Sequence, residues 1–440
     1  MLTWPASDFQ QILMISDVAA ATGKPDPGFT LSSTARVRGP LDVECLDAAF
    51  DDVVARNDIL RTTLVQEHGM WCQQVHPHRT VSLERIEAAG RSPAELAQAW
   101  SAVPIAADRP PVIRGFLSRL SDDDHLVGLS CNHLYIDARS ITIAVQELAQ
   151  AYEARLAGRR IAPLALQYGA YVQHQLSRPR DEETLRSWLR TSGTFQPMSF
   201  PCDRDCGDRT APVPASFQAT VLRAADVRRL ERWALSHRTT PFCALLTGFA
   251  LAVAARIPGR DLAIPSIIEK RGHPDTRTMI GPFLHPVILR MSVPAGSSWE
   301  TLTPTAREAV LAAYEHTHIP LSEVHANSPD MPRFSQRGGY IMFQYLPRYG
   351  SEAPIPFGAA VGATVDPESL AGRMETIGIT VRLRHAPNGD LIGWVGHDLR
   401  DHSEGQVRAL FDDFAAALTD VVRPADGRAS RKQAAQGAIR

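Results

Sequence analysis

In residues 1–177, segments whose apolar residues follow the two-residue period of strands alternate with segments that follow the longer period of amphipathic helices. Residues 30–39 fit a strand, and Asp42 is suited to cap the helix that follows. A hairpin-like stretch is centred on Gly69. The other elements predicted for this half are strands at 112–120 and 125–132, separated by the acidic turn 121–124, and a helix capped by Ser140 with Ile141, Val145, Leu148 and Tyr152 on one face. Strands that lead into helices are typical of an α/β layer.

Residues 177–214 are rich in Arg, Asp, Pro and Gly, a composition that predicts a connection between two halves. After this segment the second half of the chain also alternates strands and helices. The pair Thr240-Pro241 is typical of a helix start, and this helix is predicted to run to Gly259. The further predicted elements are strands at 262–268, 286–293 and 340–345, helices at 299–315 and 403–421, and a hairpin turned by Asn388-Gly389. We therefore expect an N-terminal lobe at 1–177, a C-terminal lobe with crossover segments at 178–423, and a disordered tail at 424–440.

Length and composition fit a globular protein with two domains or lobes, because 440 residues with 44% hydrophobic content can bury a large core. The net charge of −2 is too small to recruit a polyanion, so no nucleic-acid partner is expected. The longest apolar run, Pro241 to Ala255, is shorter than the roughly 20 residues that a membrane helix needs. The N-terminus lacks a secretory signal pattern, so we expect no membrane association and a cytoplasmic location.

Metal, nucleotide and flavin sites are not expected from the motifs in the chain. Among the 6 cysteines only Cys202 and Cys206 are close together, and no histidine or second cysteine pair lies near them to complete a metal site. No glycine-rich loop of the kind that cradles phosphates is present either. The cysteines are therefore expected to be reduced and structural.

His133 is the strongest candidate for chemistry in the chain. It follows an apolar strand and lies four residues before Asp137, an acid that can brace the imidazole or fix the loop. Histidine is suited to take a proton near neutral pH, as acyl transfer to an amine or alcohol requires. The bare H-x-x-x-D pattern is weak, because the chain has 15 histidines and His397 and Asp401 form a second match in a polar context. A core histidine hydrogen-bonded to backbone remains the alternative for His133.

Several segments, read in chain order, together resemble the condensation domains of nonribosomal peptide synthetases, within the chloramphenicol acetyltransferase-like superfamily. The family's H-H-x-x-x-D-G signature is similar to residues 132–138, which here begin with Asn132-His133 and end with Asp137-Ala138. The other matching segments are Arg56 to Thr62, Gln74-Val75, Gln167 to Tyr171, Arg271, Ile280 to Phe283, Leu289-Arg290, His316 to Pro320 and Tyr340 to Phe343. The resemblance covers roughly residues 30 to 420, which is most of the chain.

The resemblance implies a layered α/β fold in which two chloramphenicol acetyltransferase-like lobes form a V with a central tunnel. It implies that His133 is the general base, and that Asp137 supports the site through a pair with Arg271. It also implies that an acyl or peptidyl carrier protein presents a thioester on its phosphopantetheine arm, and that a small-molecule or carrier-bound amine or hydroxyl acceptor receives the acyl group. No directly bound cofactor is expected.

Two other functions stay open beside this one. The first is a coenzyme A-dependent acyltransferase of the same superfamily, although the D-F-G-W-G motif of the plant-type group is absent. The second is a non-catalytic module that recruits a partner enzyme. The identities of donor and acceptor, and the choice between amide and ester, are left open.

Three positions differ from the family pattern. Asn132 replaces the first histidine, Ala138 replaces the glycine, and His285 stands where the family often has asparagine. Asn132 can still hydrogen-bond as a supporting residue. The methyl group of Ala138 either narrows the approach to His133 or excludes a backbone conformation that only glycine adopts. Ser140, Gly281 and His285 are expected to line the tunnel, and His285 could instead lie on the surface.

Overall fold

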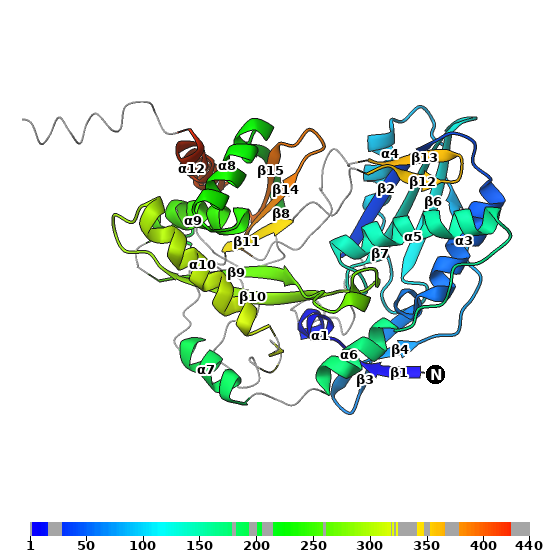
Figure 1. The fold of residues 1–440 in the computed structure, drawn as a ribbon, viewed down its shortest axis with the longest axis horizontal. Helices are drawn as coiled ribbons and strands as arrows, with labels where there is room; N and C mark the ends of the chain where they lie inside the picture. Colours follow the sequence, from blue (N-terminus) through cyan, green and yellow to red (C-terminus); the bar gives the residue numbers. More distant parts are fainter. Residues whose placement is uncertain are drawn as a thin grey trace, which may run out of the picture.

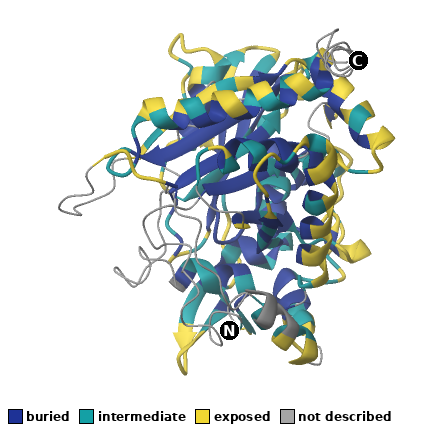
Figure 2. Ribbon diagram, turned by 90° about the vertical axis from the view of Figure 1, so that its left-hand side faces the viewer, coloured by how far each residue is buried: buried dark blue, intermediate teal, exposed yellow. Residues whose placement is uncertain are grey.

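The computed structural model describes residues 2–15, 29–177, 182–192, 200–204, 214–257, 261–317, 319–320, 323, 341–346, 353–365 and 378–423. Two α/β lobes make up this part of the chain, one built mainly from the first half of the sequence and the other from the second (Figure 1). In both lobes the strands are largely buried, whereas the helices expose one face (Figure 2).

The N-terminal lobe is built on a six-stranded sheet in the order β12-β13-β2-β7-β6-β5. Its central strands are antiparallel, and β2 pairs with β7 along their whole length, from Thr30 opposite Asn132 to Arg38 opposite Asp124. The strands of this sheet are β2 (Thr30–Arg38), β5 (Glu84–Arg85), β6 (Ile113–Ser121), β7 (Asp124–Asn132), β12 (Ile355–Phe357) and β13 (Ala360–Val365). The C-terminal end of β7 carries the segment 132–138.

Helices and a small second sheet complete this lobe. Asp42 caps α3 by accepting a hydrogen bond from the backbone N–H of Cys45, and α4 starts with a capping box between Ser92 and Glu95. The helices are α1 (Asp8–Ile15), α3 (Val43–Arg56), η1 (Asp58–Arg61), α4 (Pro93–Ser101), α5 (Ala138–Leu156) and α6 (Tyr168–Leu176). The small sheet, in the order β1-β4-β3, consists of β1 (Leu2–Pro5), β3 (Thr62–Glu67) and β4 (Met70–Val75).

The C-terminal lobe contains a four-stranded sheet in the order β11-β14-β15-β8 and a two-stranded ribbon of β9 and β10. The strands are β8 (Pro214–Leu222), β9 (Asp261–Glu269), β10 (Leu284–Ser292), β11 (Ile341–Leu346), β14 (Ile379–His385) and β15 (Leu391–Asp398). The helices on this side are α7 (Glu182–Ser192), α8 (Ala224–Ser236), α9 (Pro241–Ala254), η2 (Pro274–Thr276), α10 (Trp299–Glu315) and α12 (Glu404–Val422). In Figure 1, α8, α9 and α12 lie on the outer side of the four-stranded sheet, and its other side is turned toward the N-terminal lobe.

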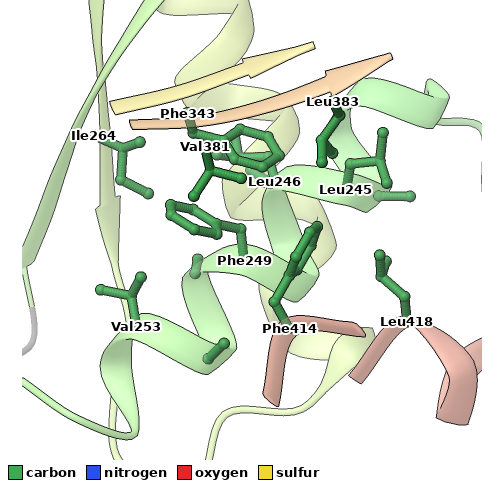
Figure 3. Packing of buried hydrophobic residues seen from close by; sticks show 14 of the residues in the cluster. Leu245, Leu246, Phe249, Val253, Ile264, Phe343, Val381, Leu383, Phe414 and Leu418 are labelled. Atoms are coloured by element: carbon green, nitrogen blue, oxygen red, sulfur yellow. The ribbon is translucent and has the colours of Figure 1, made fainter. Parts of the chain in front are cut away.

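The core of the C-terminal lobe forms where α9 and α12 cover that sheet (Figure 3). The ring of Phe249 on α9 stacks on Phe343 of β11 at 4.5 Å and meets Phe414 of α12 edge-on at 5.7 Å. Aromatic rings in these orientations add to the stabilisation from buried apolar area. The sheet is therefore fixed on the helix side, and its opposite face is available to face the other lobe.

Residues from the second half of the chain extend the sheet of the N-terminal lobe. Strand β13 pairs antiparallel with β2, from Val361 opposite Arg38 to Val365 opposite Thr34. Strand β12 then pairs with β13 at the edge of the sheet. The two halves are thus joined by backbone hydrogen bonds as well as by side chains.

Most elements predicted from periodicity are confirmed, including the hairpin around Gly69, the hairpin at Asn388-Gly389 and the helix at 299–315. Two details were wrong. The helix that starts at Pro241 ends at Ala254 rather than Gly259, and α5 is capped by Asp137 rather than Ser140. The tail at 424–440 and most of the connection at 177–214 lie outside the described residues.

Candidate active site

His133 lies at the end of β7, where the chain turns into α5. Its backbone N–H donates to the carbonyl of Phe29 at 2.7 Å, and its ring nitrogen Nδ1 lies 2.7 Å from the carbonyl oxygen of Ile136. Because a carbonyl oxygen only accepts, Nδ1 carries the hydrogen in the neutral ring. The other nitrogen, Nε2, then has an unprotonated lone pair. Within the described part of the chain, Nε2 makes no hydrogen bond.

Two aromatic rings enclose the imidazole. Phe29 stacks on it at 4.5 Å between ring centroids, and Phe9 of α1 lies at 5.6 Å. The side chain is only 8% exposed, and this desolvation lowers the pKa of His133 from 6.5 to about 4. The ring is therefore neutral at pH 7, the form in which Nε2 can accept a proton.

The burial of neutral His133 predicts that acid destabilises the folded protein. Between pH 6.5 and about 4 the unfolded chain takes up a proton on this side chain and the folded chain does not, so stability falls as the pH drops through this window. We expect this group alone to lower the free energy of unfolding by about 2 kcal/mol between pH 7 and pH 5. Urea denaturation at both pH values measures the effect.

The control for this titration is a histidine at the surface. His133→Asn should remove part of the pH dependence, whereas His174→Asn, at an exposed position of α6, should leave it unchanged. If the stability of the wild-type protein and that of His133→Asn depended equally on pH, the lowered pKa of His133 would be contradicted. His397, whose pKa is also lowered by desolvation, contributes in the same direction and accounts for part of the dependence that remains.

Asn132 is buried and forms hydrogen bonds within the N-terminal lobe. Its Nδ2 donates to the carbonyl of Ile105 at 3.1 Å, and its Oδ1 accepts from the backbone N–H of Leu134 at 3.0 Å. These bonds hold the turn that carries His133. Asparagine at this position is compatible with an intact loop.

Ala138 is the first residue of α5 and has no positive φ angle, so the methyl group causes no backbone strain. The suggestion that this position needs a glycine-only conformation was therefore wrong. The side chain is partly exposed.

Asp137 connects the two lobes. Its carboxylate accepts from the backbone N–H of Ser140 at 2.6 Å and from that of Phe283 at 2.9 Å. Both oxygens also lie 3.1 Å from Nη2 of Arg271, and both side chains of this pair are almost fully buried. The Arg271 guanidinium lies 4.0 Å from the ring centroid of Phe283. These contacts hold the Asp137 carboxylate between the two lobes.

A second ion pair extends this connection. Nε of Arg271 lies 2.5 Å from Glu269, and Glu269 also lies 3.3 Å from Nη1 of Arg139. Burial raises the pKa of Glu269, and the two guanidinium groups oppose that effect. Positive and negative groups thus alternate through Asp137, Arg271, Glu269 and Arg139, two from each lobe. The sequence analysis missed Glu269 and Arg139, although each lies within two residues of a named position.

Ser140 and Gly281 were expected to line a tunnel, and the structure instead buries them between the lobes. The Ser140 hydroxyl donates to the carbonyl of Gly281 at 2.7 Å and accepts from the N–H of Gly281 at 3.0 Å. Ser140 is 0% exposed, and a Cβ on Gly281 would lie 2.3 Å from the ring of Tyr168. Only glycine allows this close approach, so both residues serve packing.

The two other histidines named from the sequence are also buried. His285 lies on β10, is 6% exposed and has its Nδ1 at 3.8 Å from Asp8 of α1, so the surface alternative was wrong. His397 was expected in a polar, solvated stretch, but it lies near the end of β15 with 0% exposure. The structure brings Asp137, Ser140, Arg271 and Gly281 together at the start of α5, the helix that follows His133, and it places His397 near the end of a strand in the C-terminal lobe.

The aromatic residues around His133 had no signal in the sequence. Phe9 and Phe29 come from segments far from the motif, and an apolar residue at such a position is usually only a core residue. Among the described residues, no group of three or more His, Cys, Asp or Glu side chains is arranged to hold a metal ion. None of the described helices combines the length and hydropathy of a membrane-spanning segment.

The family model of the condensation domain matches residues 5–336, so the chain belongs to this family. Members of this family act in nonribosomal peptide synthesis, where condensation domains are transferases that form amide or ester bonds with substrates held on carrier proteins. The family also includes non-catalytic members.

The curated relatives are large synthetases. The chain is 28% identical over 304 residues to nonribosomal peptide synthetase kk1B of Curvularia clavata, which covers 66% of this chain and 2% of the synthetase. It is also 28% identical over 319 residues to cyclosporin synthetase simA of Tolypocladium inflatum, covering 70% of this chain and 2% of that synthetase. The chain therefore spans only a small fraction of the relatives that it matches.

Solved structures share the fold over nearly the whole chain. SgcC5 protein from Streptomyces globisporus superposes with a TM-score of 0.82 at 20% identity, covering 96% of this chain and 99% of that one. The X-domain from teicoplanin biosynthesis gives 0.78 at 23% identity, with 96% and 95% coverage. The first condensation domain of the CDA synthetase gives 0.76 at 20% identity, with 96% and 97% coverage. The two-lobed fold predicted from the resemblance is confirmed.

Proposed function

We propose that this protein is a condensation enzyme that transfers an acyl or aminoacyl group from a carrier-protein thioester to an amine or hydroxyl acceptor, with His133 as the general base. The observation that carries the proposal is the hydrogen bond from Nδ1 of His133 to the carbonyl of Ile136. This bond selects the tautomer in which Nε2 is a proton acceptor. Family membership supplies the reaction class.

The proposed reaction needs one proton transfer. The acceptor nitrogen or oxygen attacks the thioester carbonyl, and Nε2 of His133 takes the proton that the acceptor loses. The new C–N or C–O bond forms as the C–S bond breaks, and the proton passes to the sulfur of the leaving phosphopantetheine thiol. The low pKa of His133 makes it a weak base toward a free amine, so proton transfer follows the start of bond formation, when the attacking group has become acidic.

Orientation of the two reactants contributes most of the rate enhancement in this proposal. A thioester is already activated, and well-oriented reactants can account for about 7–11 kcal/mol of a barrier. Asp137 and Arg271 hold the loop that carries His133 and fix it against the other lobe. They are positioning residues rather than acids or bases in the reaction.

The test of the donor class is a reconstituted assay. The full chain is supplied with the same acyl group as a carrier-bound thioester and as a coenzyme A thioester, with a panel of amine and hydroxyl acceptors, and amide or ester product is measured by mass spectrometry. The proposal expects product from the carrier-bound donor at a far higher rate. Equal rates with coenzyme A would favour the coenzyme A-dependent alternative.

A recruitment module is the second candidate, because Asn132 and Ala138 depart from the family signature. The X-domain from teicoplanin biosynthesis, which shares this fold, has been solved as a complex with OxyB. If this chain works in that way, it should bind a carrier-containing protein stably, form no product with any donor, and bind equally well after His133→Ala. Measured binding of the wild-type and variant proteins separates the two functions.

A further inference from the structure

Helix α1 lies at the boundary between the two lobes, beside β10 (Figure 1). Its Met14 belongs to the core of the N-terminal lobe, whereas its Ile12 packs against Ile319, from the second half of the chain. A carboxylate oxygen of Asp8 lies 3.8 Å from Nδ1 of His285, on β10. Because both lobes hold α1 in place, it is a fixed support for the groups that its remaining residues contact.

The side chain of Gln10 makes two hydrogen bonds in the interior, where the residue is 0% exposed. Its Oε1 accepts from the backbone N–H of Ser7 at 2.9 Å, and its Nε2 donates to the carbonyl of Leu134 at 3.1 Å. The Ser7 hydroxyl in return accepts from the N–H of Gln10 at 3.3 Å, which completes a capping box at the start of α1. The bond to Leu134 joins α1 to the turn that carries His133.

The peptide group that follows Leu134 is held at both of its polar atoms. Its carbonyl accepts from Gln10, and its N–H, which belongs to Tyr135, donates to a backbone carbonyl at 3.0 Å. This peptide lies inside the turn 133–136, which is closed by the bond from Nδ1 of His133 to the carbonyl of Ile136. A peptide fixed at both atoms cannot rotate, so the turn keeps the Ile136 carbonyl within reach of Nδ1.

Phe9, the neighbour of Gln10 on α1, contacts the imidazole itself. Its ring centroid lies 5.6 Å from that of His133, and the residue is 4% exposed. Phe29 stacks on the same imidazole at 4.5 Å. Successive residues of one helix therefore contact the imidazole ring and the turn that carries it.

We propose that Gln10 is a positioning residue that fixes the tautomer and orientation of His133, with Phe9 supporting the imidazole ring. The inference rests on the proposed function, in which Nε2 of His133 takes the proton. The hydrogen stays on Nδ1 because that atom donates to the carbonyl of Ile136. Without the bond from Gln10 the peptide after Leu134 can rotate, and both tautomers of the imidazole become populated. Gln10 itself takes part in no proton transfer.

The test replaces Gln10 with methionine, which has a similar length and no amide. The ring nitrogens of His133 are followed by NMR in histidine-labelled protein, and their signals are identified by their absence from His133→Gln. In the wild type we expect one nitrogen with a hydrogen and one without, whereas Gln10→Met should give signals averaged between the two tautomers. With saturating carrier-bound donor, turnover should fall by up to about 100-fold, since misplaced reacting groups cost about this much, and KM for the donor should not change.

Gln167 supplies the matched control. Its amide also bridges two backbone groups, because it donates to the carbonyl of Arg56 at 2.9 Å and accepts from the N–H of Asp58 at 3.1 Å. Gln167→Met loses the same two kinds of hydrogen bond outside the turn 133–136. It should keep the wild-type signals of His133 and the wild-type turnover of folded molecules.

A second variant covers the case in which Gln10→Met does not fold. Gln10→Glu retains the capping box at the start of α1, because a glutamate oxygen also accepts from the N–H of Ser7. At alkaline pH its carboxylate has no hydrogen to donate to the carbonyl of Leu134. Gln10→Glu should therefore give the averaged signals of His133. Circular dichroism and thermal unfolding confirm that each variant is folded.

The outcomes separate this inference from the proposed function. Wild-type signals of His133 in a folded Gln10 variant overturn the inference, and so do averaged signals that appear equally in Gln167→Met. Averaged signals that depend on Gln10 support it even if no donor yields product. In that case the proposed function fails and the positioning of His133 by Gln10 remains.

Discussion

Replacing His133 with alanine is expected to lower turnover by about 100- to 10,000-fold, the range that a general base contributes. The same loss is expected for His133→Gln, because an amide cannot take the proton. The fold should survive, since the backbone N–H of residue 133 still bonds to Phe29 and Asn132 still holds the turn. Product formation per folded molecule, measured with saturating carrier-bound donor, gives the effect.

His397 supplies the matched control for this experiment. It begins the second H-x-x-x-D match of the chain but lies near the end of β15 in the C-terminal lobe. His397→Ala should reduce stability, because the side chain is fully buried, and should leave the turnover of folded molecules unchanged. The assignment of His133 as the base would be lost if His133→Ala turned over at the wild-type rate.

Removal of the Asp137 carboxylate is expected to have the largest effect on stability. In Asp137→Ala, the backbone N–H groups of Ser140 and Phe283 lose their acceptor, and Arg271 loses one of two carboxylate partners. Loss of one member of a buried ion pair typically costs about 3–5 kcal/mol. Urea denaturation followed by circular dichroism measures the change in the free energy of unfolding.

Asp42 provides a comparison because it also caps a helix, and among the described residues it forms no ion pair with the other lobe. Its side chain accepts from the N–H of Cys45 at the start of α3. Loss of such a cap costs about 1 kcal/mol, so the excess cost of Asp137→Ala over Asp42→Ala measures the contact between the lobes. Similar costs for the two variants would mean that the pair with Arg271 adds little stability.

The fold was predictable where local patterns are strong. The apolar strand before His133, the Ncap-proline start at Thr240-Pro241 and the Asn388-Gly389 turn each depend on a few neighbouring residues, and the structure agrees with all three. A serine before an apolar run is a common helix cap, which is why Ser140 is the cap that the sequence predicts for α5. The Asp137 side chain takes that role because the helix begins earlier, at Ala138.

The candidate site was predictable only in part, since its geometry comes from residues distant in sequence. The motif and the family resemblance pointed to His133, Asp137 and Arg271. They carried no information about Phe29 stacking on the imidazole or about Phe9 beside it. The tunnel positions predicted for Ser140 and Gly281 follow from their closeness to the motif segments. Their mutual hydrogen bonds, which bury both, depend on how the lobes meet.

The pairing of β13 with β2 has a consequence for synthesis of the chain on the ribosome. Strand β2 is synthesised early and can pair with β7 on one side. The partner of its other edge is β13, whose residues 361–365 are synthesised much later. Until then the nascent lobe presents an open strand edge, the kind of surface that pairs with other chains. A fragment that ends before β12 would keep this edge permanently, so expression of the first half alone should favour aggregation over a stable lobe.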